Sequence, residues 1–142
     1  MAQGKATPLR LLAQDADDLA VISAALQDAV AKVGDIHFEA RGRRLTIAFN
    51  RFRWEAGGER VRSALQLGGV LKVQQRRLRI SARQAVVELL AVEFEPGEAP
   101  GGHVVFRFAG DADLRVQVEC VDAVLADLSQ PWPSPRTPQH ET

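Results

Sequence analysis

The chain has 142 residues, of which 46% are hydrophobic, and its 18 Lys and Arg balance its 18 Asp and Glu. No apolar run reaches the ~20 residues of a membrane-spanning helix, and the polar N-terminus lacks the apolar stretch of a signal peptide. The single cysteine excludes an internal disulfide, so we expect a globular protein of a reducing cytoplasm with no membrane association.

The N-terminal part predicts a leader, a strand and a helix. Residues 1–8 are polar and end in Pro8, which is typical of a flexible leader, and residues 9–12 predict a short strand. Asp15 or Asp17 can cap the helix that follows, which we expect to end near Lys32. Its apolar residues recur at helical spacing: Leu19, Ile22, Leu26, Val30 and Val33.

The middle of the chain predicts strands over residues 35–40, 44–54, 61–67, 70–75 and 85–95, with a short helix as the alternative for 85–91. In the second of these, Leu45, Ile47 and Phe49 share one face. The same alternation would put Arg51 in the core. We therefore expect either that the strand leaves the core at Asn50 or that a bulge exchanges its faces.

The C-terminal part predicts an antiparallel hairpin followed by a helix. Val104, Phe106 and Phe108 alternate inward, and the second strand of the hairpin does the same up to Cys120, which we expect to be buried. The predicted helix carries an apolar stripe: Val121, Val124, Leu125 and Leu128. Proline-rich residues 131–142 predict a disordered tail.

These elements predict a single α+β domain over residues 9–130. Its architecture would be a mostly antiparallel curved sheet or small barrel of six to seven strands, with one N-terminal and one C-terminal helix, similar to a pleckstrin-homology-like fold. An open antiparallel sheet with both helices on one face is the alternative.

The charge is unevenly distributed. Residues 41–83 hold twelve Lys and Arg against two Asp and Glu, a net charge of +10, whereas residues 1–40 carry −3 and residues 84–142 carry −7. We expect an Arg-rich sheet face that docks an anionic partner, with an acidic protein preferred to nucleic acid because the pI is only 6.8. The residues expected to form this face are Arg51, Arg53, Trp54, Arg60, Arg62, Lys72 and Arg76.

Other interpretations remain open at this point. The acidic flanks can neutralise the basic strands within the fold or across a homo-oligomer, in which case the chain is a structural subunit. An RNA-binding module and a small enzyme with a site near Cys120 or His37 are further alternatives. The sequence contains no phosphate loop, no catalytic triad motif and no metal-ligand cluster, so we expect no cofactor, no metal and no named catalytic residue.

Four stretches, residues 19–34, 50–55, 89–102 and 116–132, resemble a bacterial family, domain of unknown function family 2948. The resemblance extends from about Leu9 to Trp132 and implies a compact cytoplasmic protein. It implies no activity and no catalytic residues. The chain departs from the family pattern between Trp54 and Arg60, where the family carries a longer polar insert.

Overall fold

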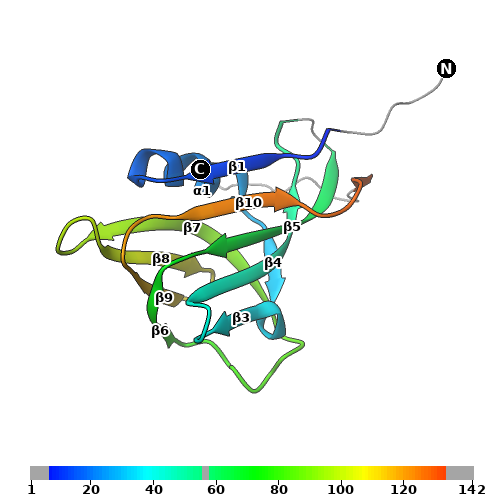
Figure 1. Cartoon of the computed structure of the whole chain (residues 1–142). Helices are drawn as coiled ribbons and strands as arrows, with labels where there is room; N and C mark the ends of the chain where they lie inside the picture. Colours follow the sequence, from blue (N-terminus) through cyan, green and yellow to red (C-terminus); the bar gives the residue numbers. More distant parts are fainter. Residues whose placement is uncertain (1–6, 56–57, 134–142) are drawn as a thin grey trace.

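The computed structural model describes residues 7–55 and 58–133, in which one α-helix accompanies an eleven-stranded sheet (Figure 1). The helix α1 spans Ala16–Ala25, and the short 3₁₀ helix η1 spans Val33–Asp35. The strands are β1 Arg10–Ala13, β2 Val30–Lys32, β3 Ile36–Glu39, β4 Arg44–Phe52, β5 Glu59–Leu67, β6 Val70–Arg76, β7 Val86–Pro96, β8 Gly102–Phe108, β9 Ala112–Val118, β10 Ala123–Asp127 and β11 Trp132–Pro133.

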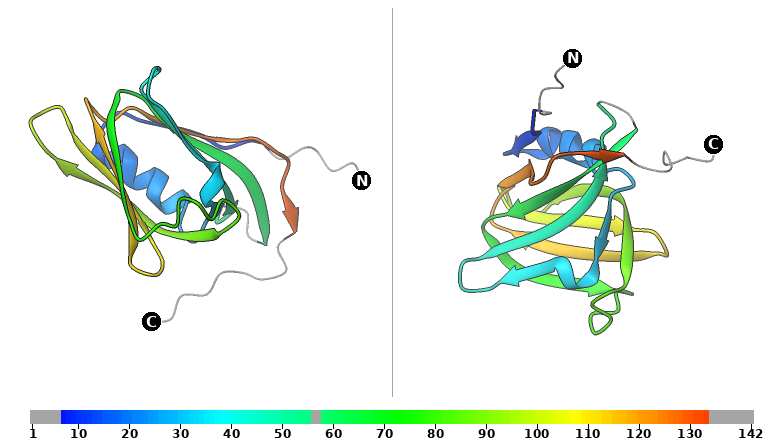
Figure 2. Two further views of the ribbon diagram at one scale, coloured as in Figure 1. Left: turned by 90° about the horizontal axis from the view of Figure 1, so that it is seen from below. Right: turned by 90° about the vertical axis from the view of Figure 1, so that its right-hand side faces the viewer.

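The strands form one open sheet in the order β1-β10-β5-β4-β2-β7-β8-β9-β6, with β3 beside β4 and β11 beside β5. The sheet is strongly curved, and α1 lies within the curve, where it packs against β7 and β1 (Figure 2). The antiparallel character matches the prediction. The predicted fold class is nevertheless wrong, because the described residues form a sheet of eleven strands rather than six to seven, with one α-helix instead of two.

Helix α1 begins as expected and ends earlier than expected. The Asp15 carboxylate accepts a hydrogen bond from the Asp18 amide at 2.8 Å, which caps the first turn. The expected end near Lys32 is wrong because Asp28 adopts a left-handed backbone conformation with φ of 63°. Its amide then donates to the Leu89 carbonyl at 3.0 Å, so the chain leaves the helix to join the sheet. Val30, which the helical spacing had placed in the helix, therefore lies in β2.

The predicted C-terminal helix is absent from the described residues, and β10 takes its place. Ala123 and Leu125 are buried at a spacing of two, as in a strand, and β10 pairs with β1 on one side and with β5 on the other. Cys120 is exposed rather than buried. It lies in the turn before β10, where Glu119 and Asp122 hydrogen-bond to Gly69 and Gly68, so it no longer follows the alternation of β9.

The buried interior consists of side chains from both halves of the sheet and from α1, including Phe49, Phe106, Phe108, Leu19 and Ile22. None of the described helices is long and apolar enough to cross a membrane. Most of the predicted leader and tail, residues 1–6 and 134–142, lies outside the described residues.

Candidate docking surface

The Arg51 side chain lies inside the sheet. Pairing between β4 and β5 is unbroken as far as Phe52, so the strand neither leaves the core at Asn50 nor bulges there, and Arg51 is 0% exposed. Its guanidinium donates to Asp127 through Nε and Nη2 at 3.0 Å each, and to Glu55 at 3.0 and 2.7 Å. Arg51 is therefore a structural cation and does not form part of a docking face.

Asp127 is the centre of a hydrogen-bonded cluster around the buried Arg51, which we call the Arg51 clasp: Arg51, Glu55, Ser63 and Asp127. Besides Arg51, its carboxylate accepts from Ser63 Oγ at 2.7 Å and from the Leu9 amide at 2.8 Å. Burial by itself raises the Asp127 pKa, but these hydrogen bonds and the Arg51 charge outweigh it and hold the pKa below its ordinary value of 3.8. The clasp joins β4, β5 and β10 to the segment before β1.

Arg53 and Trp54 follow β4 and are also engaged within the fold. Arg53 donates to Glu59 at 2.5 Å, and its side chain is 12% exposed. The Trp54 indole nitrogen donates to the Gln27 carbonyl at 3.1 Å, and the ring packs edge-on against Phe52. Trp54 is still 39% exposed, so part of its ring is accessible.

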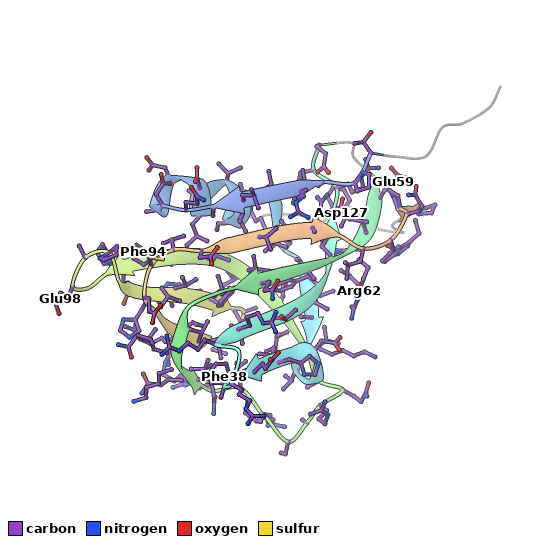
Figure 3. All side chains as sticks on the ribbon, viewed as in Figure 1. Phe38, Glu59, Arg62, Phe94, Glu98 and Asp127 are labelled. Atoms are coloured by element: carbon purple, nitrogen blue, oxygen red, sulfur yellow. The ribbon has the colours of Figure 1, made fainter. Side chains whose placement is uncertain are left out.

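Arg60 and Arg62 lie on the outer face of β5, where they alternate with the buried Val61 and Ser63. Arg62 bonds to Asp35 at 2.9 Å and to Asn50 Oδ1 at 3.2 Å. Arg60 donates to the Asn50 carbonyl at 3.2 Å and forms no ion pair with a described residue. In Figure 3, Arg62 lies at the same end of the sheet as Glu59 and Asp127.

Lys72 and Arg76 lie on β6, which is not a neighbour of β5 in the sheet. Arg76 is held by two carboxylates, Asp113 at 2.8 Å and Asp111 at 3.0 Å, which raise its pKa and lower that of Asp111. Lys72 is exposed and forms no ion pair with a described residue. The structure thus distributes the expected face over two separate regions, and acidic side chains from the flanks neutralise several of its members.

A second group of cations was not among the expected site residues. Arg41, in the β3–β4 turn, and Arg79 and Arg83, in the β6–β7 loop, are exposed and have no carboxylate within ion-pair distance among the described residues. In Figure 1 both segments lie in the lower part of the molecule, although the view from below in Figure 2 separates them. The Val70 amide donates to the Arg43 carbonyl beside the first of them. With Lys72 they form what we call the basic rim: Arg41, Lys72, Arg79 and Arg83.

The signal for the basic rim was present in the sequence. The residues expected to form the docking face were chosen from strand alternation, a criterion that does not consider cations in turns. However, Arg41, Arg79 and Arg83 lie where no Asp or Glu is nearby in the sequence apart from Glu39, and Glu39 bonds to Arg44 instead. An inventory of acidic residues within reach of each turn would have found this group.

A shallow hollow of about 340 Å³ lies between the β7–β8 turn and strands β6 and β9, and its lining includes Glu98, His103 and Glu119 but neither Cys120 nor His37. No group of three or more metal-ligating side chains occurs among the residues that the structure describes.

Comparison with known proteins gives one match. A family model described as "Protein of unknown function (DUF2948)" matches residues 9–140, which is nearly the whole chain. No curated protein and no solved structure matches the chain.

Proposed function

The chain belongs to the DUF2948 family of proteins of unknown function, and from its own geometry we propose that it is a non-enzymatic docking module whose basic rim binds an acidic protein partner. As part of the same proposal we place it in the bacterial cytoplasm, where a lone exposed thiol such as Cys120 stays reduced.

The observation that carries this proposal is the uncompensated charge of the basic rim. The other cations in the basic part of the chain are largely used within the fold: Arg51 by Asp127, Arg62 by Asp35 and Arg76 by Asp113. The rim cations are exposed and have no ion-pair partner among the described residues, so an anionic surface brought against them would compensate their charge.

An acidic protein fits the rim better than nucleic acid does. Base stacking needs aromatic rings beside the cations. Exposed Phe38 of β3 is three residues from Arg41 in the chain, but the larger ring of Trp54 follows the end of β4 whereas Arg41 precedes its start. Nine strand residues separate the two ends, a span of roughly 30 Å at 3.3 Å per residue. The pI of 6.8 is also low for a nucleic-acid-binding domain.

Capture of a partner from native lysate tests the proposal. Tagged wild-type protein is compared with Lys72→Glu and Arg79→Glu, at low and moderate salt, with nuclease-treated and untreated halves. The matched control is Arg10→Glu, which changes the net charge equally at an exposed cation of β1, outside the rim. We expect a nuclease-resistant, salt-sensitive partner that both rim variants lose and the control retains.

Two results would contradict the proposal. Equal capture by wild type and both rim variants would show that the rim does not dock, and loss of the partner after nuclease treatment would assign the rim to nucleic acid. Reversal of Arg60 and Arg62 is a poorer test, because Arg62 is bonded to Asp35 and its reversal would also break an ion pair within the fold.

A further inference from the structure

Strand β6 ends the sheet with a largely open edge. In the strand order it is the last member, and among the described strands it pairs with β9 alone; on its outer side, the Val70 amide at its start donates to the Arg43 carbonyl. Five of its seven residues are exposed, including Leu71, Lys72 and Gln74. Such an edge offers unpaired backbone groups to any strand that reaches it.

The register of β6 shows which of its residues present these groups. The Glu119 amide donates to the Gly69 carbonyl, so Gly69 and Glu119 form a hydrogen-bonded pair. A bulge between Val70 and Lys72 then places Lys72 opposite Gln117. Because bonding direction alternates along a strand, Lys72, Gln74 and Arg76 turn their backbone groups toward β9.

Val73 and Gln75 consequently turn their N–H and C=O groups toward the open edge. Outside the sheet ladder, the main chains of these two residues form no backbone hydrogen bond with another described residue. The edge therefore presents two N–H donors and two C=O acceptors in an extended conformation, the pattern that an added strand uses.

The charge beside this edge selects what can bind there. A lysine and a bulge on an edge strand prevent edge-to-edge pairing of identical strands, and a second copy of β6 would bring a second Lys72 to the same edge. The carboxylates of an acidic strand would instead be attracted to the cations at this edge. Lys72 has no ion-pair partner among the described residues, and Arg79 follows just beyond the end of the strand.

We propose that the open edge of β6 receives an extended acidic polypeptide segment as an added strand. This inference rests on the proposed docking function and names the form in which the partner binds. Alternate side chains of the added strand would lie beside Lys72, Gln74 and Arg76. Arg76 is already paired with Asp111 and Asp113, so the carboxylates of the added strand would be matched by Lys72 and by Arg79 just beyond the strand. The intervening side chains would lie beside the half-buried Val73, so they are apolar.

A labelled ten-residue peptide of alternating Glu and Val is the probe, and fluorescence anisotropy with the full chain measures its binding. A peptide of alternating Glu and Pro carries the same charge but lacks half of the N–H donors and cannot pair as a strand. A peptide of alternating Lys and Val tests the sign of the charge. We expect only the Glu-Val peptide to bind.

Val73→Pro removes one outward N–H of β6 and leaves the bonds to β9 in place. Its matched control, Val73→Ala, loses the same packing and keeps the N–H. We expect Val73→Pro to weaken binding of the Glu-Val peptide at least about tenfold, and Val73→Ala to weaken it by less than about threefold. Thermal unfolding of both variants confirms that they are folded.

The outcomes separate this inference from the proposed function. If the Glu-Pro peptide binds as well as the Glu-Val peptide, and Lys72→Glu abolishes both, the rim docks acidic chains by charge alone and strand addition is wrong. If neither acidic peptide binds, or folded Val73→Pro binds like Val73→Ala, strand addition is also overturned. In these cases the lysate experiment still decides the docking function by itself.

Discussion

Replacing Asp127 with Ala tests the energetic role of the Arg51 clasp. The substitution leaves the fully buried Arg51 without one of its two carboxylate partners, and it also removes the acceptor for Ser63 Oγ and for the Leu9 amide. Breaking a buried ion pair by removing one partner costs ~3–5 kcal/mol. Because Glu55 still bonds to Arg51, we expect the lower end of this range, about 3 kcal/mol.

Urea denaturation of the wild type and Asp127→Ala measures this loss as a difference in the free energy of unfolding. For a chain of this length, the same loss lowers the melting temperature by roughly 10 °C. Glu55→Ala is the matched control, since the Glu55 side chain is 44% exposed; we expect it to cost only about 1 kcal/mol. A loss below about 1 kcal/mol for Asp127→Ala would refute the view that the clasp holds Arg51 in the core.

Three further predictions concern pH, packing and thiol reactivity. The Asp127 and Glu55 pKa values are held below their ordinary values of 3.8 and 4.5, so the stabilisation from these carboxylates is present above those values and is lost as the pH falls through the lower folded-state pKa values. Urea midpoints should therefore fall more steeply below about pH 4 in the wild type than in Asp127→Asn. Parallel curves for the two proteins would contradict this. Gly102→Ala places a Cβ 2.4 Å from the Glu95 carbonyl and 2.7 Å from the Phe94 ring, so it should lower the unfolding free energy by about 2 kcal/mol or more, and an unchanged urea midpoint would be inconsistent with this close packing. Exposed Cys120 should react with a chromogenic disulfide reagent in the native protein, one thiol per chain and without denaturant, whereas reaction only after unfolding would show that the thiol is buried.

Much of the sheet could be predicted from the sequence because its strands alternate. The hairpin of β8 and β9 follows the spacing of Val104, Phe106 and Phe108, and the start of α1 follows from Asp15. Both errors in the predicted helices, the late end of the first and the presence of the second, occur where helical and strand spacing coincide over a few residues. A helix fits the spacing of Val121, Val124, Leu125 and Leu128, but a strand fits the spacing of Ala123 and Leu125 equally well. The segment is a strand because it pairs with β1 on one side and β5 on the other.

The candidate site was harder to predict because it depends on contacts distant in sequence. Arg51 is neutralised by Asp127, 76 residues later in the chain, and Arg62 by Asp35, 27 residues earlier. Local charge counts treat all of these cations as free. The same limit applies to β6: its strand pattern was correctly predicted, but its position at the edge follows from strand order, which the sequence pattern does not specify.

The position of β10 has a consequence for the synthesis of the protein. Strands β1 and β5 both pair with β10 and not with each other, so neither sheet ladder can form until residues 123–127 have left the ribosome. Nascent chains at that stage expose two strand edges, including most of β5, to chaperones and to other chains. Completion of this half of the sheet is therefore a late event, in which the last long strand is inserted between two that were made much earlier.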